Sequence, residues 1–318
     1  MTTTVSPLRA LLQGLGDVLK APLMLVAIAI VMVLITLPFA AAINSELQRS
    51  LSVQPQVNLA DTEIDPEWWM EFREHATGLA ATFTPAVLGF AATLDGLSHV
   101  LDGQAPPAAI IGPLFLSIVV WAFLWGGALH RFQQGRGLGF TGFIRAGRSR
   151  LLTFIVIAAA AAIVNVILYV TVHNMLFGPV HRALTAMVST ERDAFLIRSV
   201  LYLIFFTCLG AVSLVADYAR VFSVAGNDRS IAGALRGSIA FIRSHFGAVV
   251  TLYVITGAIF VVLTAAYGVL EIYGGSQVGG WRAVAIGQAY VFARLGIRLA
   301  FASSELRLFN ASHTAAAV

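Results

Sequence analysis

The sequence predicts an all-α integral membrane protein, a polytopic bundle of six transmembrane helices with amphipathic helices at the membrane interface. Hydrophobic residues make up 58% of the 318 residues and charged residues only 11%, whereas a soluble domain has about 25% charged residues. Uncharged runs long enough to cross a bilayer recur along the chain, and arginine-rich connections alternate with an acidic region. We therefore expect one membrane domain over residues 1–318, in contact with the lipid bilayer.

The connection at residues 131–150 orients the bundle. It carries five arginines and no acid, and short loops rich in Arg or Lys stay on the cytoplasmic side of a membrane. A second connection, residues 217–245, also has more arginines than acids. We expect both connections and both termini to be cytoplasmic. The net charge of +4 then reflects membrane topology and does not indicate nucleic-acid binding.

The apolar runs predict where the six spans lie. The first run has 23 residues, enough to cover a hydrocarbon core of about 30 Å at about 1.5 Å per helical residue. The single cysteine, Cys208, lies in the fourth run and cannot form an internal disulfide. The predicted spans are residues 21–43, 107–129, 151–172, 196–216, 246–270 and 281–301.

Three amphipathic segments precede spans on the arginine-rich side, at residues 6–20, 141–150 and 230–245. In the first, leucines recur at helical spacing, which is typical of a helix lying on the membrane surface. A simple helical lead-in to the span fits the same pattern. Each segment begins with a small polar residue and then turns apolar and basic. This predicts three helical hairpins, unless all junctions on this side simply look alike.

Residues 44–106 form the one sizeable exposed region, with nine acids and two bases. Asp65 followed by Pro66 indicates the start of a helix, and the Trp68 side chain in that helix suits a membrane interface. This acidic region is the candidate contact surface for a protein partner.

Residues 76–94, within the acidic region, carry no charge. A crossing here would place the arginine-rich connection outside, and Pro85 and Gly89 interrupt the run. We expect an interfacial or re-entrant segment instead of a seventh span.

The sequence of residues 217–247 is DYARVFSVAGNDRSIAGALRGSIAFIRSHFG. Together with the hairpin pattern, it resembles that of a group of uncharacterised bacterial six-span membrane proteins. The group includes the membrane domain attached to some glycerophosphodiester phosphodiesterases. The resemblance covers most of the chain and implies a place in the bacterial cytoplasmic (inner) membrane. Residues 1–318 contain no counterpart of the soluble phosphodiesterase domain of those fusions. The resemblance therefore implies no catalytic residue in this chain.

Charged side chains inside a span are costly and usually face protein or a water-filled cavity. The sixth span carries Arg294 and Arg298, four residues apart on one helix face. They are either an anion or lipid-headgroup site opening to the cytoplasm or structural partners of Asp217 or Glu305. We favour structural pairing, with Asp217 as the partner of Arg294. Asn165, in the third span, predicts an interhelical hydrogen bond. The candidate polar residues are Asp217, Arg294, Arg298, Gln288 and Asn165.

The sequence shows no nucleophile elbow, no zinc-binding HExxH, no Walker loop and no paired intramembrane carboxylates. Scattered histidines give little support for a metal site. We predict no catalytic, cofactor or metal residues, and a non-enzymatic envelope scaffold or accessory subunit. One alternative is a transporter or lipid-handling permease with an Arg-lined cytoplasmic site, which a cavity at Arg294 would favour. Another is a membrane-embedded enzyme, which a cluster of carboxylate, His and Arg at one interface would favour.

Overall fold

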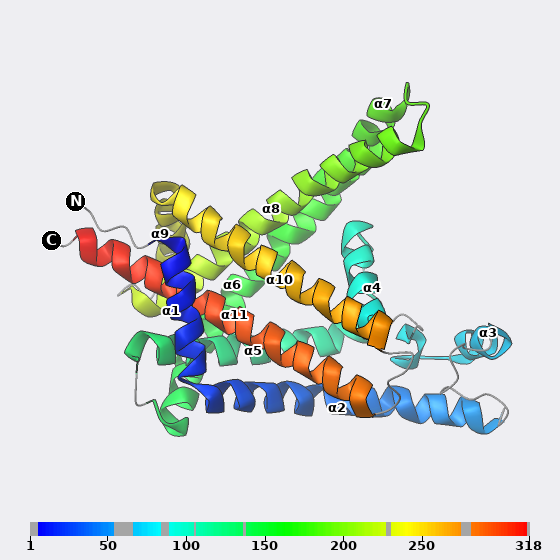
Figure 1. Cartoon of the computed structure of the whole chain (residues 1–318), viewed down its shortest axis with the longest axis horizontal. Coiled ribbons are helices and arrows are strands. Elements are labelled where there is room, and N and C mark those ends of the chain that lie inside the picture. Colours follow the sequence, from blue (N-terminus) through cyan, green and yellow to red (C-terminus); the bar gives the residue numbers. More distant parts are fainter. Residues whose placement is uncertain are drawn as a thin grey trace. The chain divides into compact units, whose positions relative to one another are not determined.

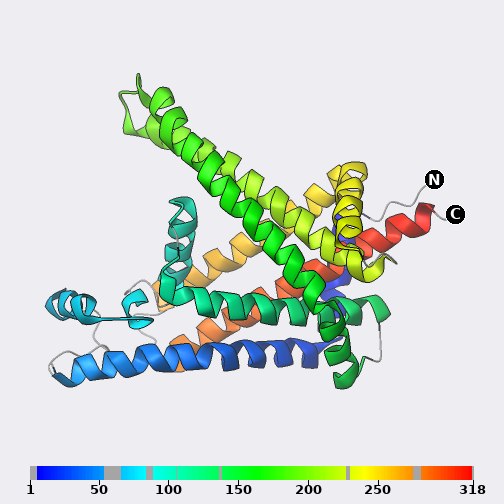
Figure 2. The same ribbon diagram turned by 180° about the vertical axis from the view of Figure 1, so that it is seen from behind.

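The computed structural model confirms the all-α class. It describes residues 6–53, 66–83, 89–104, 106–135, 138–226, 230–274 and 281–316, and every regular element within these ranges is a helix (Figures 1 and 2). Six helices are long and apolar enough to cross a membrane, which is the number predicted. The chain is a multi-pass membrane protein whose apolar helices contact the lipid bilayer.

The helices that carry the spans are longer than the predicted spans. Helices α8 and α11 have 35 and 36 residues, or more than 50 Å at about 1.5 Å per residue, so their ends project beyond a hydrocarbon core of about 30 Å. The spanning helices are α2 (Pro22–Val53), α5 (Ala108–Gln134), α6 (Phe140–Leu168), α8 (Glu191–Ala225), α10 (Phe246–Gly274) and α11 (Trp281–Ala316). The shorter helices are α1 (Pro7–Leu19), α3 (Pro66–His75), α4 (Gly89–Leu101), α7 (His181–Thr185) and α9 (Ile231–Ser244).

The chain divides into two compact units. Unit 1 contains Met1–Val18, Ile118–Ile255 and Leu299–Val318, and unit 2 contains Leu19–Ser117 and Thr256–Arg298. Each is described by itself below, and the prediction of one membrane domain stays a prediction.

In unit 1, α6 and α8 run side by side as a long hairpin with α7 at its tip (Figures 1 and 2). The chain was expected to leave the membrane as a loop at about His173, but it stays helical to Thr185 through two π-helical turns, Tyr169–His173 and Leu176–Val180. Packing explains the difference. Leu176 and Phe205 belong to one buried apolar cluster between the two helices, so the extra turns of α6 have a partner in α8.

Two of the three amphipathic segments are separate helices. Ser6 accepts a hydrogen bond from the Arg9 N–H at the start of α1, and Ser230 accepts one from the Gly233 N–H at the start of α9. Both are N-caps. Proline at position 22 disfavours helical backbone in the residue before it, which separates α1 from α2.

Within the connection at 131–150, residues 143–150 were expected to be a short surface helix separate from the span, and this was wrong. Helix α5 continues to Gln134, and residues 140–150 are the first turns of α6, which runs on without a break. No proline or glycine stands between Arg148 and the apolar residues that follow, so nothing interrupts the backbone hydrogen bonds.

In unit 2, helix α3 begins at Pro66 as predicted, while its expected cap, Asp65, lies outside the described residues. Trp68 does not face a membrane interface: its side chain is 1% exposed and packs with Phe72 and Phe83 in a small aromatic core. The Trp68 Nε1–H also donates to Ser50 Oγ at 3.1 Å. Tertiary burial against α2 therefore overrides the amphipathic preference of this tryptophan.

Residues 76–94 do not form one spanning helix in the part that the structure describes. They contain a 3-10 turn, Ala80–Thr82, and the start of α4 at Gly89, whereas Pro85 lies outside the described residues. The Glu271 carboxylate of α10 accepts a hydrogen bond from the Phe90 N–H at 2.5 Å, and the Phe90 ring meets Tyr267 with centroids 6.2 Å apart. The start of α4 is thus anchored on α10.

Candidate functional site

Each amphipathic segment of unit 1 crosses the end of a spanning helix at a glycine. We call α1, residues 140–150 and α9 the lead-in helices. A Cβ atom added to Gly14 of α1 would overlap Ser304 Oγ and the Ala300 carbonyl oxygen of α11. A Cβ added to Gly147 would lie 2.8 Å from the Phe123 carbonyl oxygen of α5, and one added to Gly237 of α9 would lie 2.5 Å from the Phe222 ring of α8.

The order of these contacts closes a ring. Residues 140–150 contact α5 and α9 contacts α8, so two lead-in helices lie against the span that comes just before them in the chain. Helix α1 contacts α11. A side-chain hydrogen bond of 3.0 Å from Asn310 to Gln133 also ties the end of α11 to the end of α5. We call this arrangement the collar.

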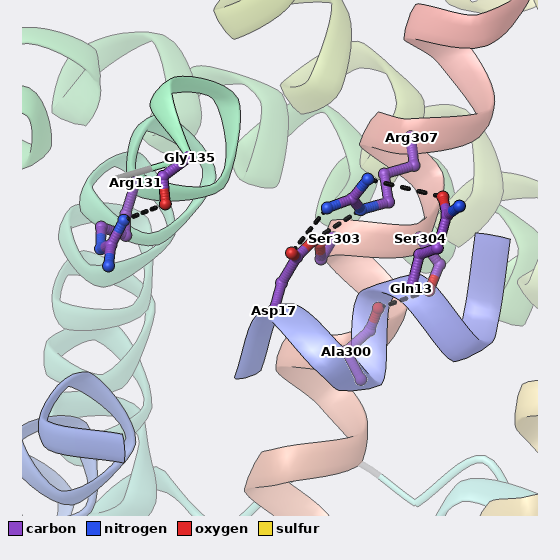
Figure 3. A network of polar contacts seen from close by, with 8 residues as sticks. All are labelled: Gln13, Asp17, Arg131, Gly135, Ala300, Ser303, Ser304 and Arg307. Carbon is purple, nitrogen blue, oxygen red and sulfur yellow. Dashed lines mark hydrogen bonds and ion pairs between the residues drawn. The ribbon is translucent and has the colours of Figure 1, made fainter. Parts of the chain in front are cut away.

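An ion pair holds α1 to α11 within the collar (Figure 3). The Arg307 Nε–H donates to Asp17 Oδ2, and an Arg307 terminal N–H donates to Asp17 Oδ1, both at 2.6 Å. The Ser303 hydroxyl donates to Asp17 Oδ2 at 2.6 Å. Arginine is suited to such a two-point contact because its guanidinium donors match the spacing of carboxylate oxygens. The Asp17 side chain is 15% exposed and the Arg307 side chain 39%, so the carboxylate is the more sheltered member of the pair.

The acidic residue of α11, Glu305, lies inside the collar. It is 3% exposed, and Tyr218 of α8 is fully buried. Among the described residues, neither Glu305 Oε1 nor the Tyr218 hydroxyl has a hydrogen-bond partner. Asp217 and Arg220 lie near enough to act electrostatically on Glu305, and these two bond to each other one helical turn apart.

The collar has a carboxylate, arginine and tyrosine cluster, and two of its acids are paired with arginines. Asp17 is bound by Arg307 and Asp217 by Arg220, and buried charges in proteins are usually paired in this way. The described residues contain no group of three or more His, Cys, Asp or Glu that could hold a metal ion. The arrangement is suited to clamping helix ends together.

Asp217 and Asn165 belong to unit 1, and Gln288, Arg294 and Arg298 belong to unit 2. Asp217 belongs to the collar. Gln288, Arg294 and Arg298 are exposed on α11, and the Arg294 guanidinium carbon lies 5.2 Å from the centroid of the Phe260 ring of α10. The predicted pair of Arg294 with Asp217 would join the two units, and it stays a prediction.

Asn165 is half-buried on α6. Its Oδ1 is buried and has no hydrogen-bond partner among the described residues. The predicted interhelical hydrogen bond is therefore not made through this oxygen.

Unit 2 carries a cleft of about 250 Å³ between α2 and α3. Its charged lining comprises Glu46 and Arg49 of α2 and Glu71 and His75 of α3. Glu46 and Arg49 form an ion pair of 3.0 Å. The aromatic core around Trp68 forms one side of α3, which leaves Glu71 and the neighbouring acids exposed on the other.

Sequence reasoning missed Asp17, Arg307 and Glu271 as structural residues. Asp17 was assigned only to the polar side of an amphipathic helix, and Glu271 only to the end of a span. One signal was present: an acid and an arginine, each at a helix end within an apolar chain, need partners. The sequence does not say which partners.

Comparisons with protein-family models, with curated proteins and with solved structures found no match to this chain. The resemblance to bacterial six-span membrane proteins therefore stays an expectation, as does the orientation of the termini.

Proposed function

We propose that this protein is a non-enzymatic membrane scaffold or accessory subunit, which binds a protein partner through α3 and the projecting end of α2. The partner we expect carries a lysine- or arginine-rich segment, because residues 44–106 contain nine acids and two bases. Complementary charge mainly sets the specificity and association rate of such a contact.

The observation that carries the proposal is that α3 has its own tertiary support. Trp68 and Phe72 are 1% and 3% exposed, and they pack on Ile43 and Leu47 of α2. Helix α2 has 32 residues, about 48 Å at 1.5 Å per residue, so its last turns extend past a core of about 30 Å. A segment held in this way presents fixed acidic side chains, which a flexible loop would not.

Site-specific photocrosslinking in intact membranes tests the proposal. A crosslinking residue at Glu71 or Glu74 should give a discrete adduct with one protein, which high salt and the change of the other two acids among Glu67, Glu71 and Glu74 to Lys should abolish. A crosslinker at Met187, which is 98% exposed near α7, is the matched control. Equal adducts at Met187, or adducts that survive the charge reversal, would contradict binding at the acidic face.

The alternative function is a transporter or lipid-handling permease, supported by the exposed Arg294 and Arg298 on α11. Uptake into proteoliposomes distinguishes the two functions. A scaffold should give no flux of anions or lipids above that of empty liposomes, whereas a permease should give flux that falls when the two arginines are changed to glutamine.

A further inference from the structure

The first turns of α6 carry two exposed cations among exposed apolar side chains. Ile144, Arg148 and Leu152 follow one another at intervals of four, so they form one ridge of the helix. Ile144 is 40% exposed and Leu152 is 77% exposed, and Arg148 between them is exposed as well. Arg145, three residues before Arg148, is exposed beside this ridge. Each guanidinium therefore has an apolar neighbour one turn away or closer, on a surface that other parts of the protein leave open.

The opposite face of the same turns is covered by protein. Ala146 and Gly147 are buried, and a Cβ atom added to Gly147 would lie 2.8 Å from the Phe123 carbonyl oxygen of α5. This close packing fixes the rotation of α6 about its own axis. At about 100° per residue, it directs Arg145 and Arg148 away from α5.

The depth of the two arginines follows from α6 alone. Residues 151–172 carry no charge, and Ile163, on the same side as Leu152, is 62% exposed, so this stretch meets hydrocarbon. Arg148 precedes Leu152 by four residues and Arg145 by seven, or about 6 Å and 10 Å along the axis. The polar headgroup layer adds about 5–8 Å on each side of the hydrocarbon core, and a flexible arginine stem covers the remaining distance.

No acid of the described chain neutralises these two arginines. The connection at 131–150 contains no Asp or Glu, and neither Arg145 nor Arg148 forms an ion pair with any described residue. Charged groups at the edge of an apolar surface are stabilised by a counter-ion. Both guanidinium groups are therefore available to an anion from outside the chain.

We propose that Arg145 and Arg148 bind the phosphate group of an anionic phospholipid, in the leaflet that the start of α6 enters. A planar guanidinium donates two parallel hydrogen bonds to phosphate oxygens, and the second arginine one turn away adds charge at the same place. Phe140 is 79% exposed one turn before Ile144, and this mixture of exposed apolar and basic side chains suits a lipid better than a soluble anion. The site uses no residue of α3, so neither proposal depends on the other.

The test uses the full chain in nanodiscs of zwitterionic lipid that contain a photoactivatable phosphatidylglycerol, with the adducts mapped by mass spectrometry to residues 140–156. The double variant Arg145→Gln, Arg148→Gln should lower these adducts about tenfold or more, as expected for the loss of two basic contacts. The variant Arg145→Lys, Arg148→Lys should keep most of them, because it retains both positive charges.

The matched control is the double variant Arg182→Gln, Arg192→Gln. Both of these arginines are exposed, and they lie at the far end of the hairpin of α6 and α8, where α7 forms the tip. The control removes the same two positive charges at a distance much greater than the screening length of about 10 Å at 0.1 M salt. It should leave the adducts at residues 140–156 unchanged.

Four results would overturn the proposal: unchanged adducts in the double glutamine variant, an equal loss in the control, equal competition by unlabelled phosphatidylcholine and phosphatidylglycerol, or displacement of the lipid by millimolar inorganic phosphate. The third would show that the headgroup charge is not recognised, and the fourth would assign the arginines to a soluble anion. Thermal unfolding is followed for every variant. If the double glutamine variant is unfolded, the single variants Arg145→Gln and Arg148→Gln replace it, and each should lower the adducts by about threefold or more, roughly the loss of one basic contact.

Discussion

Asp17 and Arg307, 290 residues apart in the chain, join α1 to α11 through two hydrogen bonds of 2.6 Å. The Ser303 hydroxyl donates a third hydrogen bond to the same carboxylate. This pair lies where the glycine of α1 crosses α11, so one small area carries both the steric and the ionic contacts that close the collar.

Removing either member of this pair should destabilise the protein. Asp17→Asn or Arg307→Gln leaves a sheltered charged partner without its counter-ion, and we expect each to lower the free energy of unfolding by about 2 kcal/mol. The double variant should lose less than the sum of the two. Unfolding in detergent, followed by circular dichroism, measures the three changes.

The control for this cycle is Glu46→Gln, which breaks the pair with Arg49, whose side chain is 77% exposed. Exposed pairs contribute about 1 kcal/mol or less. Additive losses at Asp17 and Arg307, or a loss at Glu46 of equal size, would mean that the collar pair is not a coupled stabilising contact.

Two glycines of α1 should respond in opposite directions to alanine. Gly14 has no room for a Cβ atom, whereas a Cβ at Gly16 meets nothing within 4 Å. Gly14→Ala should force α1 away from α11 and cost about 1–3 kcal/mol. Gly16→Ala should be neutral or stabilise the helix by up to about 1 kcal/mol. Equal melting temperatures for the two variants would show that α1 does not pack on α11 as described.

The buried hydroxyl of Tyr218 should be dispensable. It has no hydrogen-bond partner among the described residues, so Tyr218→Phe removes a polar atom without breaking a contact and should change the free energy of unfolding by less than about 0.5 kcal/mol, or raise it. Tyr218→Ala, which opens a cavity, should cost about 3–5 kcal/mol. A large loss for the phenylalanine variant would reveal a partner of the hydroxyl, such as Glu305.

Membrane orientation is testable with single cysteines in a Cys208→Ser background. Gln134, at the end of α5, and Glu74, on α3, are both exposed. Because arginine-rich connections stay inside, an impermeant maleimide should label a cysteine at position 74 in intact cells and one at position 134 only after lysis. The reverse pattern would invert the predicted topology.

The predicted spans were right in number because hydropathy is a local property: each apolar run needs only its own length to cross a bilayer. The start of α3 was predicted from the proline at position 66. The connections were harder. Residues 140–150 resemble α1 and α9 in sequence, yet they continue into α6. No helix-breaking residue separates them from the span that follows.

Of the five predicted polar residues, only Asp217 lies in the collar. The sequence singled out Arg294 and Arg298 because a charge within an apolar run is conspicuous by itself. Asp17 and Arg307 stand in polar surroundings near the chain ends, where a charge is ordinary. They matter because they bind each other, and the sequence around each residue does not indicate that contact.

The sequence by itself determined that this chain is an integral membrane protein, that it has six spans, and that amphipathic segments precede several of them. These properties depend on hydrophobicity and hydrogen bonding within single segments. Only the tertiary structure decided that α1 closes on α11, that Glu305 and Tyr218 are buried together, and that Trp68 belongs to a small core instead of an interface. Helices that can all cross a bilayer alone still have many ways to pair. Close helix packing at glycines and ion pairs between distant segments select one of these arrangements.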